Sequence, residues 1–241
     1  MRIIHLIPYF PPANCFGGTP EAVYALARAQ AQLGHEVYVI TSDAGLQKGG
    51  EPPELQLEWI ESRLIRAIGC NPEMKIVYAR NRRPALAEKK IFTASFWNRE
   101  IEKWLPGSTD ILHFHEVHIL GYRAIFQSLV PRKNINAFMS AHGSLKPPTH
   151  AKIRGFVHKL TDPILRAGWF DKLQGYFALS RAEQKQYLSC GIDPSRIHIL
   201  PHGKPEFPPS PLPLPFTIPA MQEGPTFLFV GRLNSAKGIL T

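Results

Sequence analysis

The sequence predicts an α/β fold built on a doubly wound, mainly parallel sheet. Short apolar runs of strand length alternate with segments of helical periodicity along most of the 241 residues. This alternation is typical of a parallel sheet with helices on both faces. A complete strand–loop–helix–strand unit fills the chain up to Thr41, and several later strands are followed at once by histidine or glycine.

The first unit contains a strand from Arg2 that ends at prolines, a helix over 19–33 and a strand over 36–41. Thr19 as the N-cap and Pro20 at the first helical position favour a helix start there. Val23, Leu26, Ala27, Gln30 and Leu33 continue one helical face as far as Gly34. Such a unit places its loop at the carboxyl edge of the sheet, where ligands bind.

The later elements follow from apolar periodicity and from the positions of glycine and proline. We assign strands to 55–60, 110–115, 135–140, 175–180 and 197–200, and helices to 84–105, 119–129, 152–169 and 181–188. Two segments, 64–68 and 74–78, favour neither state.

The composition is that of an ordinary globular protein, with 44% hydrophobic and 20% charged residues. No apolar run approaches the roughly 18 residues of a membrane span, and the N-terminal apolar segment is too short for a secretion signal. The cysteines Cys15, Cys70 and Cys190 form neither a metal-spaced pair nor a disulfide framework. We therefore expect a cytoplasmic protein.

The formal net charge of +9 suggests an anionic partner. Basic groups at 80–83 and 89–90 lie close to aromatic residues, and a second basic segment spans 152–166. These segments are candidates for contact with an anionic membrane surface, or they are amphipathic core helices with solvated basic faces. Nucleic acid is disfavoured, because no recognisable binding motif accompanies the charge.

The domain organisation changes after residue 204. Residues 205–225 contain eight prolines, which predicts an extended linker. A fresh strand and the start of a helix follow in 226–241. We expect one Rossmann-like domain over 1–204 and only the beginning of a second, since one exposed strand cannot form a domain. The missing part could lie on another chain.

Histidines and an acid stand at the ends of the predicted strands or directly after them: His113, His115, Glu116, His142 and His202. In a parallel sheet these residues lie along one edge, where they could bind hydroxyls or phosphate. Each histidine considered alone is better explained by capping its strand or packing locally, whereas their shared position at strand ends favours a binding site. A metal site is not expected, although His115 and His118 are close in sequence, and Ser144 lacks the surroundings of a catalytic nucleophile.

Several segments together resemble the landmarks of the retaining glycosyltransferases of family 4. These are Tyr9–Pro12 with Gly17-Gly18 and Glu21, then Asp110–Glu116, Ser140–Ser144, Pro201–Gly203, and Phe229–Leu233 with Lys237-Gly238. The resemblance covers nearly the whole chain in the right order. It implies the N-terminal, acceptor-binding half of the GT-B fold, in which two Rossmann-like halves face each other.

The resemblance also implies transfer of a sugar from a nucleotide-sugar to an acceptor hydroxyl, with retention of configuration and without a metal or other cofactor. It places Gly17, Gly18, Arg232 and Lys237 at the donor diphosphate and His142 beside the transferred sugar, where fixed cations and amides stabilise the departing charge. The resulting candidate residues are the catalytic His142, Glu116 and His115 and the acceptor-binding Glu21, Gly143, Ser144 and His118.

Two departures from the family qualify this expectation. His202 stands where the family more often has asparagine, and the carboxylate pair that grips the donor would lie beyond Thr241. We therefore expect little activity from this chain alone. The alternatives are a non-catalytic module that binds a glycan or an anionic lipid, and a nucleotide-sugar epimerase of similar fold. An oxidoreductase is disfavoured, because the dinucleotide fingerprint is missing.

Overall fold

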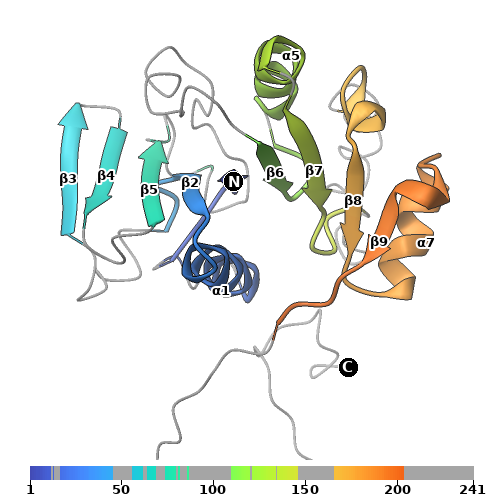
Figure 1. The fold of residues 1–241 in the computed structure, drawn as a ribbon, viewed down its shortest axis with the longest axis horizontal. Coiled ribbons are helices and arrows are strands. Elements are labelled where there is room, and N and C mark those ends of the chain that lie inside the picture. Colours follow the sequence, from blue (N-terminus) through green and yellow to red (C-terminus); the bar gives the residue numbers. More distant parts are fainter. Residues whose placement is uncertain are drawn as a thin grey trace, which may run out of the picture.

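The computed structural model describes one sheet with its covering helices (Figure 1). The described residues are 1–11, 13, 17–45, 56–61, 64–68, 74–79, 81, 86, 110–119, 121–133, 135–145 and 166–203. Most of the predicted helices 84–105 and 152–169, the linker 205–225 and the second domain 226–241 lie outside them. The predicted domain boundaries therefore stay a prediction.

The described strands form a nine-stranded sheet in the order β3-β4-β5-β2-β1-β6-β7-β8-β9. They are β1 (Arg2–Leu6), β2 (Glu36–Ser42), β3 (Gln56–Glu61), β4 (Leu64–Ile68), β5 (Met74–Ala79), β6 (Ile111–His115), β7 (Asn136–Ser140), β8 (Gly175–Ala178) and β9 (Ile197–Ile199). The described helices are α1 (Thr19–Gln32), α5 (Tyr122–Lys133) and α7 (Arg181–Ser189), with short 3₁₀ turns at Phe170–Lys172 and Pro194–Arg196.

The seven neighbouring strands β5-β2-β1-β6-β7-β8-β9 pair in parallel, which confirms the predicted fold class. The two unassigned segments are the strands β4 and β5, and the pairings of β3 with β4 and of β4 with β5 are antiparallel. All but one residue of β5 is buried. A strand covered on both faces lacks the alternation of apolar and polar residues that predicts a strand from sequence.

The N-cap of helix α1 lies one residue earlier than expected. Gly18 is the N-cap, no side chain caps this end, and the Ala22 amide donates to the Gly18 carbonyl at 3.0 Å. The assignment of Thr19 as the N-cap was therefore wrong, because Thr19 already lies inside the helix. The placement of Leu33 on the buried face was also wrong. Leu33 is 76% exposed, since the helix ends there and Gly34 turns the chain at φ +83°.

Helix α5 is shifted along the chain relative to the predicted 119–129. The segment before it forms tight turns. In these turns the Ile119 amide donates to the Val117 carbonyl, and the Tyr122 amide donates to the Ile119 carbonyl. Gly121 has φ +99°, a conformation that favours glycine and that separates these turns from the helix. The helix therefore starts at Tyr122 and runs on to Lys133.

Two apolar layers cover the two faces of the sheet. One packs Val23, Ala27 and Ala31 of α1 against β2 and β5. The other, larger layer joins α5, α7 and the segment around Trp169 to the opposite side chains of β1, β6, β7 and β8. In the part of the chain that the structure describes, no helix is both long and apolar enough to cross a membrane.

Candidate active site

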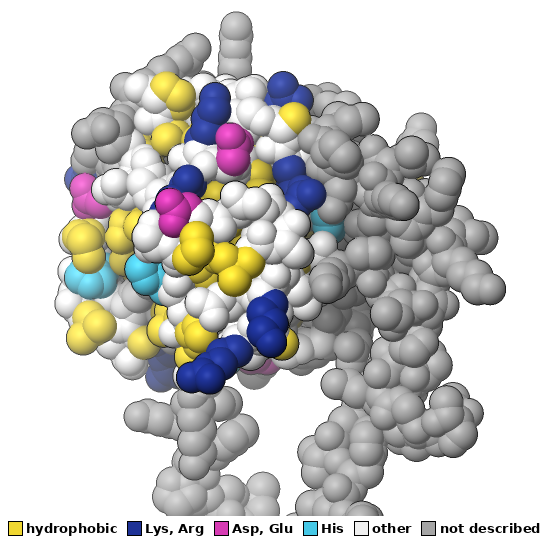
Figure 2. Space-filling view, turned by 90° about the vertical axis from the view of Figure 1, so that its right-hand side faces the viewer, with side chains coloured by type: hydrophobic (Ala, Val, Ile, Leu, Met, Phe, Trp, Pro, Cys, Tyr) yellow, Lys and Arg dark blue, Asp and Glu magenta, His cyan; other side chains and the backbone are white. Residues whose placement is uncertain are grey.

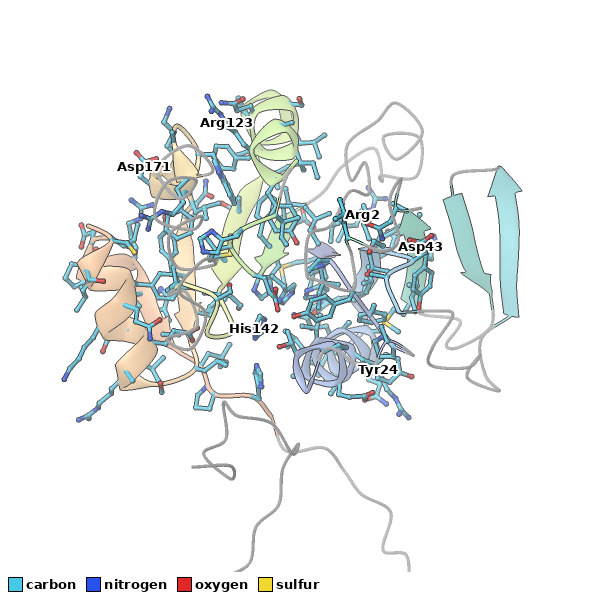
Figure 3. The ribbon with its side chains drawn as sticks, turned by 180° about the vertical axis from the view of Figure 1, so that it is seen from behind. Arg2, Tyr24, Asp43, Arg123, His142 and Asp171 are labelled. Atoms are coloured by element: carbon cyan, nitrogen blue, oxygen red, sulfur yellow. The ribbon has the colours of Figure 1, made fainter. Side chains whose placement is uncertain are left out.

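Four histidines from four parts of the sheet make a continuous hydrogen-bonded row, which we call the histidine row. His5 belongs to β1 and His115 ends β6, while His142 follows β7 and His202 follows β9. His5 and His115 are fully buried, and His202 is exposed. The row therefore runs from the inside of the sheet to its carboxyl edge, where Figure 3 shows His142 between α1 and α7.

Each contact in the row joins the Nδ1 atom of one ring to the Nε2 atom of the next. The distances are 2.9 Å from His5 to His115, 2.8 Å from His115 to His142, and 2.9 Å from His142 to His202. At the inner end, His5 Nε2 lies 2.7 Å from Gln30 Oε1 on α1. His113 lies beside the row. Its ring centroid is 4.0 Å from that of His115, and its Nε2 atom is 2.8 Å from Ser140 Oγ.

The acid that follows β6 lies at the same edge. Glu116 has φ +66°, its amide donates to the Ser140 carbonyl, and the Tyr9 hydroxyl donates to Glu116 Oε1. Burial raises the pKa of Glu116 to about 8. At neutral pH this carboxyl group is therefore mostly protonated, and it can donate a hydrogen bond as well as accept one.

The loop after β7 is held by Glu183 of α7. Gly143 N and Leu179 N donate to the two carboxylate oxygens of Glu183, each at 2.6 Å. Ser144 Oγ accepts from Val117 N at 3.0 Å and donates to the Ala141 carbonyl at 2.6 Å. The polar groups of Ser144 thus connect the loops after β6 and β7, and this connection positions His142.

The remaining predicted residues are spread more widely. Gly17, at φ +106°, and the N-cap Gly18 precede α1, and Glu21 is exposed in its first turn. His118 is half-buried in the loop after β6. The predicted phosphate-binding residues Arg232 and Lys237 lie outside the described residues.

The comparisons with known proteins identify the family. A model of Glycosyltransferase Family 4 matches residues 16–204, which is most of the chain. The chain belongs to glycosyltransferase family 4. No curated protein matches the sequence.

Solved structures similar to this family 4 chain share little sequence identity with it. The catalytic domain of starch synthase IV from Arabidopsis thaliana, bound to ADP and acarbose, is 13% identical with a TM-score of 0.41, over 58% of this chain and 33% of that one. HepE from Anabaena, in complex with UDP and glucose, is 12% identical with a TM-score of 0.47, over 85% and 45%. A trehalose-6-phosphate protein from E. coli, bound with UDP-2-fluoro glucose, is 12% identical with a TM-score of 0.43, over 79% and 42%. The family 4 chain thus spans less than half the length of each.

Among the described residues, His5, His113 and His115 offer ligand atoms that lie within 4.8 Å of one another. Both ring nitrogens of His5 and of His115 are already engaged within the row or with Gln30. The side chains are therefore arranged for hydrogen bonding, and we do not assign them as metal ligands.

Sequence reasoning did not assign four residues to this candidate site: His5, Gln30, Tyr9 and Glu183. A histidine inside an apolar strand, as His5 is, was a signal that could have been used. Glu183 follows Ser180 at capping-box spacing, and Ser180 Oγ does accept from Glu183 N. Nothing in the local sequence of Gln30 or Tyr9 marks a partner so far away along the chain.

We predict that the stability of the chain is greatest near pH 7. Burial lowers the pKa of His5 to about 4, that of His142 to about 3, and those of His113 and His115 well below 6.5. The folded state then binds fewer protons than the unfolded state below pH 6.5, so acid destabilises it. The raised pKa of Glu116 acts in the opposite direction, because the folded state holds an extra proton between pH 4.5 and about 8. Four histidines outweigh one acid up to about pH 7, because in the unfolded chain they still bind protons around pH 6.5, and well above pH 7 Glu116 alone remains.

Urea unfolding at about pH 5, 7 and 9 measures this dependence. Glu116→Gln should abolish the decline above pH 7 and make the loss of stability on the acid side steeper, because Glu116 opposes the histidines there. A stability that does not fall between pH 7 and 5 would contradict the neutral state of the buried histidines.

Proposed function

We propose that this family 4 chain takes part in transferring a sugar from a nucleotide-sugar to an acceptor hydroxyl, with retention of anomeric configuration. The proposal rests mainly on one observation: the family match over 16–204 covers the loops that bring Glu116, His142 and His202 to one sheet edge. Polar groups at the carboxyl edge of a parallel sheet are suited to ligand binding.

The roles follow from the charge that develops during transfer. The departing diphosphate gains negative charge, and amides at the N-terminus of α1, after Gly17 and Gly18, favour an anion there. Arg232 and Lys237 would add fixed cations. Glu116, protonated at neutral pH, could donate a hydrogen bond to the sugar.

The acceptor would lie against the loops after β6 and β7. His115 and His142 would support the transferred sugar from the row, and Glu21, Gly143, Ser144 and His118 would surround the acceptor hydroxyl. The expectation that no metal or other cofactor is needed belongs to the same proposal. Its support is the hydrogen-bonded state of the histidines, which leaves the ring nitrogens of His5 and His115 already engaged.

A binding and turnover assay tests the function. The purified chain is mixed with UDP-, GDP- and ADP-sugars and with simple alkyl glycosides as acceptors, while NMR follows both the protein and the products. We expect ligand-induced shifts at the row and at Glu116, little turnover by the chain alone, and retained configuration in any product. Glu116→Ala should weaken these shifts, and Glu36→Gln, at the opposite edge of the sheet, should not.

Two results would overturn the proposal. One is the absence of binding and turnover with every donor and acceptor. The other is a product of inverted configuration. Robust turnover would support the transferase and contradict only the low activity expected of the chain alone.

Contact with an anionic membrane surface is a further part of the proposed function. Its support is the formal net charge of +9. On the side of the molecule that carries α7 and β9, the described Lys and Arg side chains are spread among hydrophobic and acidic ones and form no single patch (Figure 2). Sedimentation with anionic and with neutral liposomes at two salt concentrations tests the contact, and binding that is insensitive to salt would exclude an electrostatic one.

A further inference from the structure

The contacts of the histidine row follow one repeating pattern, which the binding of a substrate by a single histidine would not require. All three contacts between its rings use Nδ1 on one side and Nε2 on the other. Each ring thus uses one nitrogen toward the inside of the sheet and the other toward its edge. For His142 this leaves neither nitrogen available to a ligand, because His115 and His202 occupy both.

The chemistry of a neutral imidazole makes the rings interdependent. Such a ring carries one N–H donor and one lone-pair acceptor. Every contact between two rings needs one of each, so the tautomer of one ring determines that of the next. The rings of His5, His115 and His142 are neutral near pH 7, because burial lowers their pKa values.

The hydrogen bond at the inner end of the row determines the direction of donation in all the others. The Oε1 atom of Gln30 can only accept, so His5 must donate to it from Nε2. His5 Nδ1 is then an acceptor and receives Nε2–H from His115. The same step repeats from His142 to His115 and from His202 to His142. All four rings therefore carry their proton on Nε2.

We propose that Gln30 sets the tautomer of His202 through the three intervening rings, so that His202 presents the lone pair of its Nδ1 atom at the open edge. A lone pair at this place accepts a hydrogen bond from a hydroxyl group. His202 is then the residue of the row that faces the ligand, and His5, His115 and His142 are positioning residues. The identity of the ligand as a sugar hydroxyl rests on the proposed function, whereas the tautomer does not.

The opposite arrangement is chemically distinct and can be observed. If the side-chain amide of Gln30 donated to His5, every ring would carry its proton on Nδ1, and His202 would offer an N–H group at the edge. The two arrangements differ at all four rings. An exposed donor and an exposed acceptor would select different ligand groups.

Nitrogen NMR of the 241-residue chain with ¹⁵N-labelled histidine tests the proposal. The ¹⁵N shift separates protonated from unprotonated ring nitrogens, and couplings across N–H···N contacts identify the neighbours. Single histidine substitutions assign the signals. We expect Nε2–H in all four rings and couplings for His5–His115, His115–His142 and His142–His202.

Two Gln30 variants separate orientation from folding. Gln30→Leu removes the acceptor, and the ratio of Nε2–H to Nδ1–H at His202 should fall by roughly fivefold. Gln30→Glu keeps an acceptor oxygen and should retain the original tautomer. His35→Gln, which lies outside the row, should change nothing.

Several results would overturn the proposal. They are a proton on Nδ1 of His202 in the unmodified chain, doubly protonated rings at pH 7, an unchanged His202 tautomer in a folded Gln30→Leu variant, or a metal ion bound stoichiometrically among His5, His113 and His115. A titration with an alkyl glycoside adds a separate arm, in which His202 Nδ1 should show the largest shift. Failure of that arm alone would count against the sugar ligand, while the tautomer result would stand.

Discussion

Replacing Trp169 with alanine should lower the free energy of unfolding by about 3–5 kcal/mol. The side chain is fully buried, and its ring packs against those of Phe114, Tyr122, Phe126 and Phe170 at centroid distances of 5.1 to 6.2 Å. These partners come from β6, from α5 and from the turn next to Trp169. The loss therefore combines apolar transfer with a cavity between elements that cannot easily collapse.

Urea unfolding followed by far-ultraviolet circular dichroism measures the Trp169→Ala effect, since that signal does not depend on the removed indole. Leu33→Ala is the matched control, because Leu33 is 76% exposed and its truncation should change stability by no more than about 0.5 kcal/mol. A loss at Trp169 no larger than that at Leu33 would show that this aromatic cluster does not hold α5 to the sheet.

Replacing Glu183 with alanine should cost about 3–6 kcal/mol of stability, since each of its two hydrogen bonds to a charged acceptor contributes about 1.5–3 kcal/mol. Glu183 is only 4% exposed, and its two oxygens hold Gly143 N and Leu179 N. Alanine would leave two amides without their acceptor. The loop that carries His142 would also lose its attachment to α7.

Thermal and urea unfolding of three variants tests this role. Glu183→Gln keeps one acceptor oxygen, so its loss should lie between those of the parent and Glu183→Ala. Glu21→Ala removes an exposed acid from the first turn of α1 and should cost at most about 1 kcal/mol. Equal losses for the alanine and glutamine variants would show that the second oxygen contributes nothing.

Much of the fold was predictable because its signals are local. β1, β2, β6 and β7 are short apolar runs with clear ends, and α7 has Ser180 as an N-cap. The errors also have local causes. β5 is buried on both faces and shows no alternation, and the turns before Tyr122 look like the start of a helix when only apolar spacing is considered.

The candidate site was predictable only in part. Glu116, His142 and His202 follow strands, so a parallel sheet brings them to one edge. The register that places His5 opposite His113 depends on the pairing of β1 with β6, which are far apart in the sequence. No periodicity within either strand specifies that pairing.

By itself, the sequence determined the alternation of strands and helices, the polar carboxyl edge and the resemblance to family 4, because each is carried by neighbouring residues. Only the tertiary structure decided that the histidines form one row with a direction. That direction depends on Gln30, whose contact with His5 joins a helix to a strand. Side-chain hydrogen bonds depend on distances of a few tenths of an ångström, and only the packed sheet sets these.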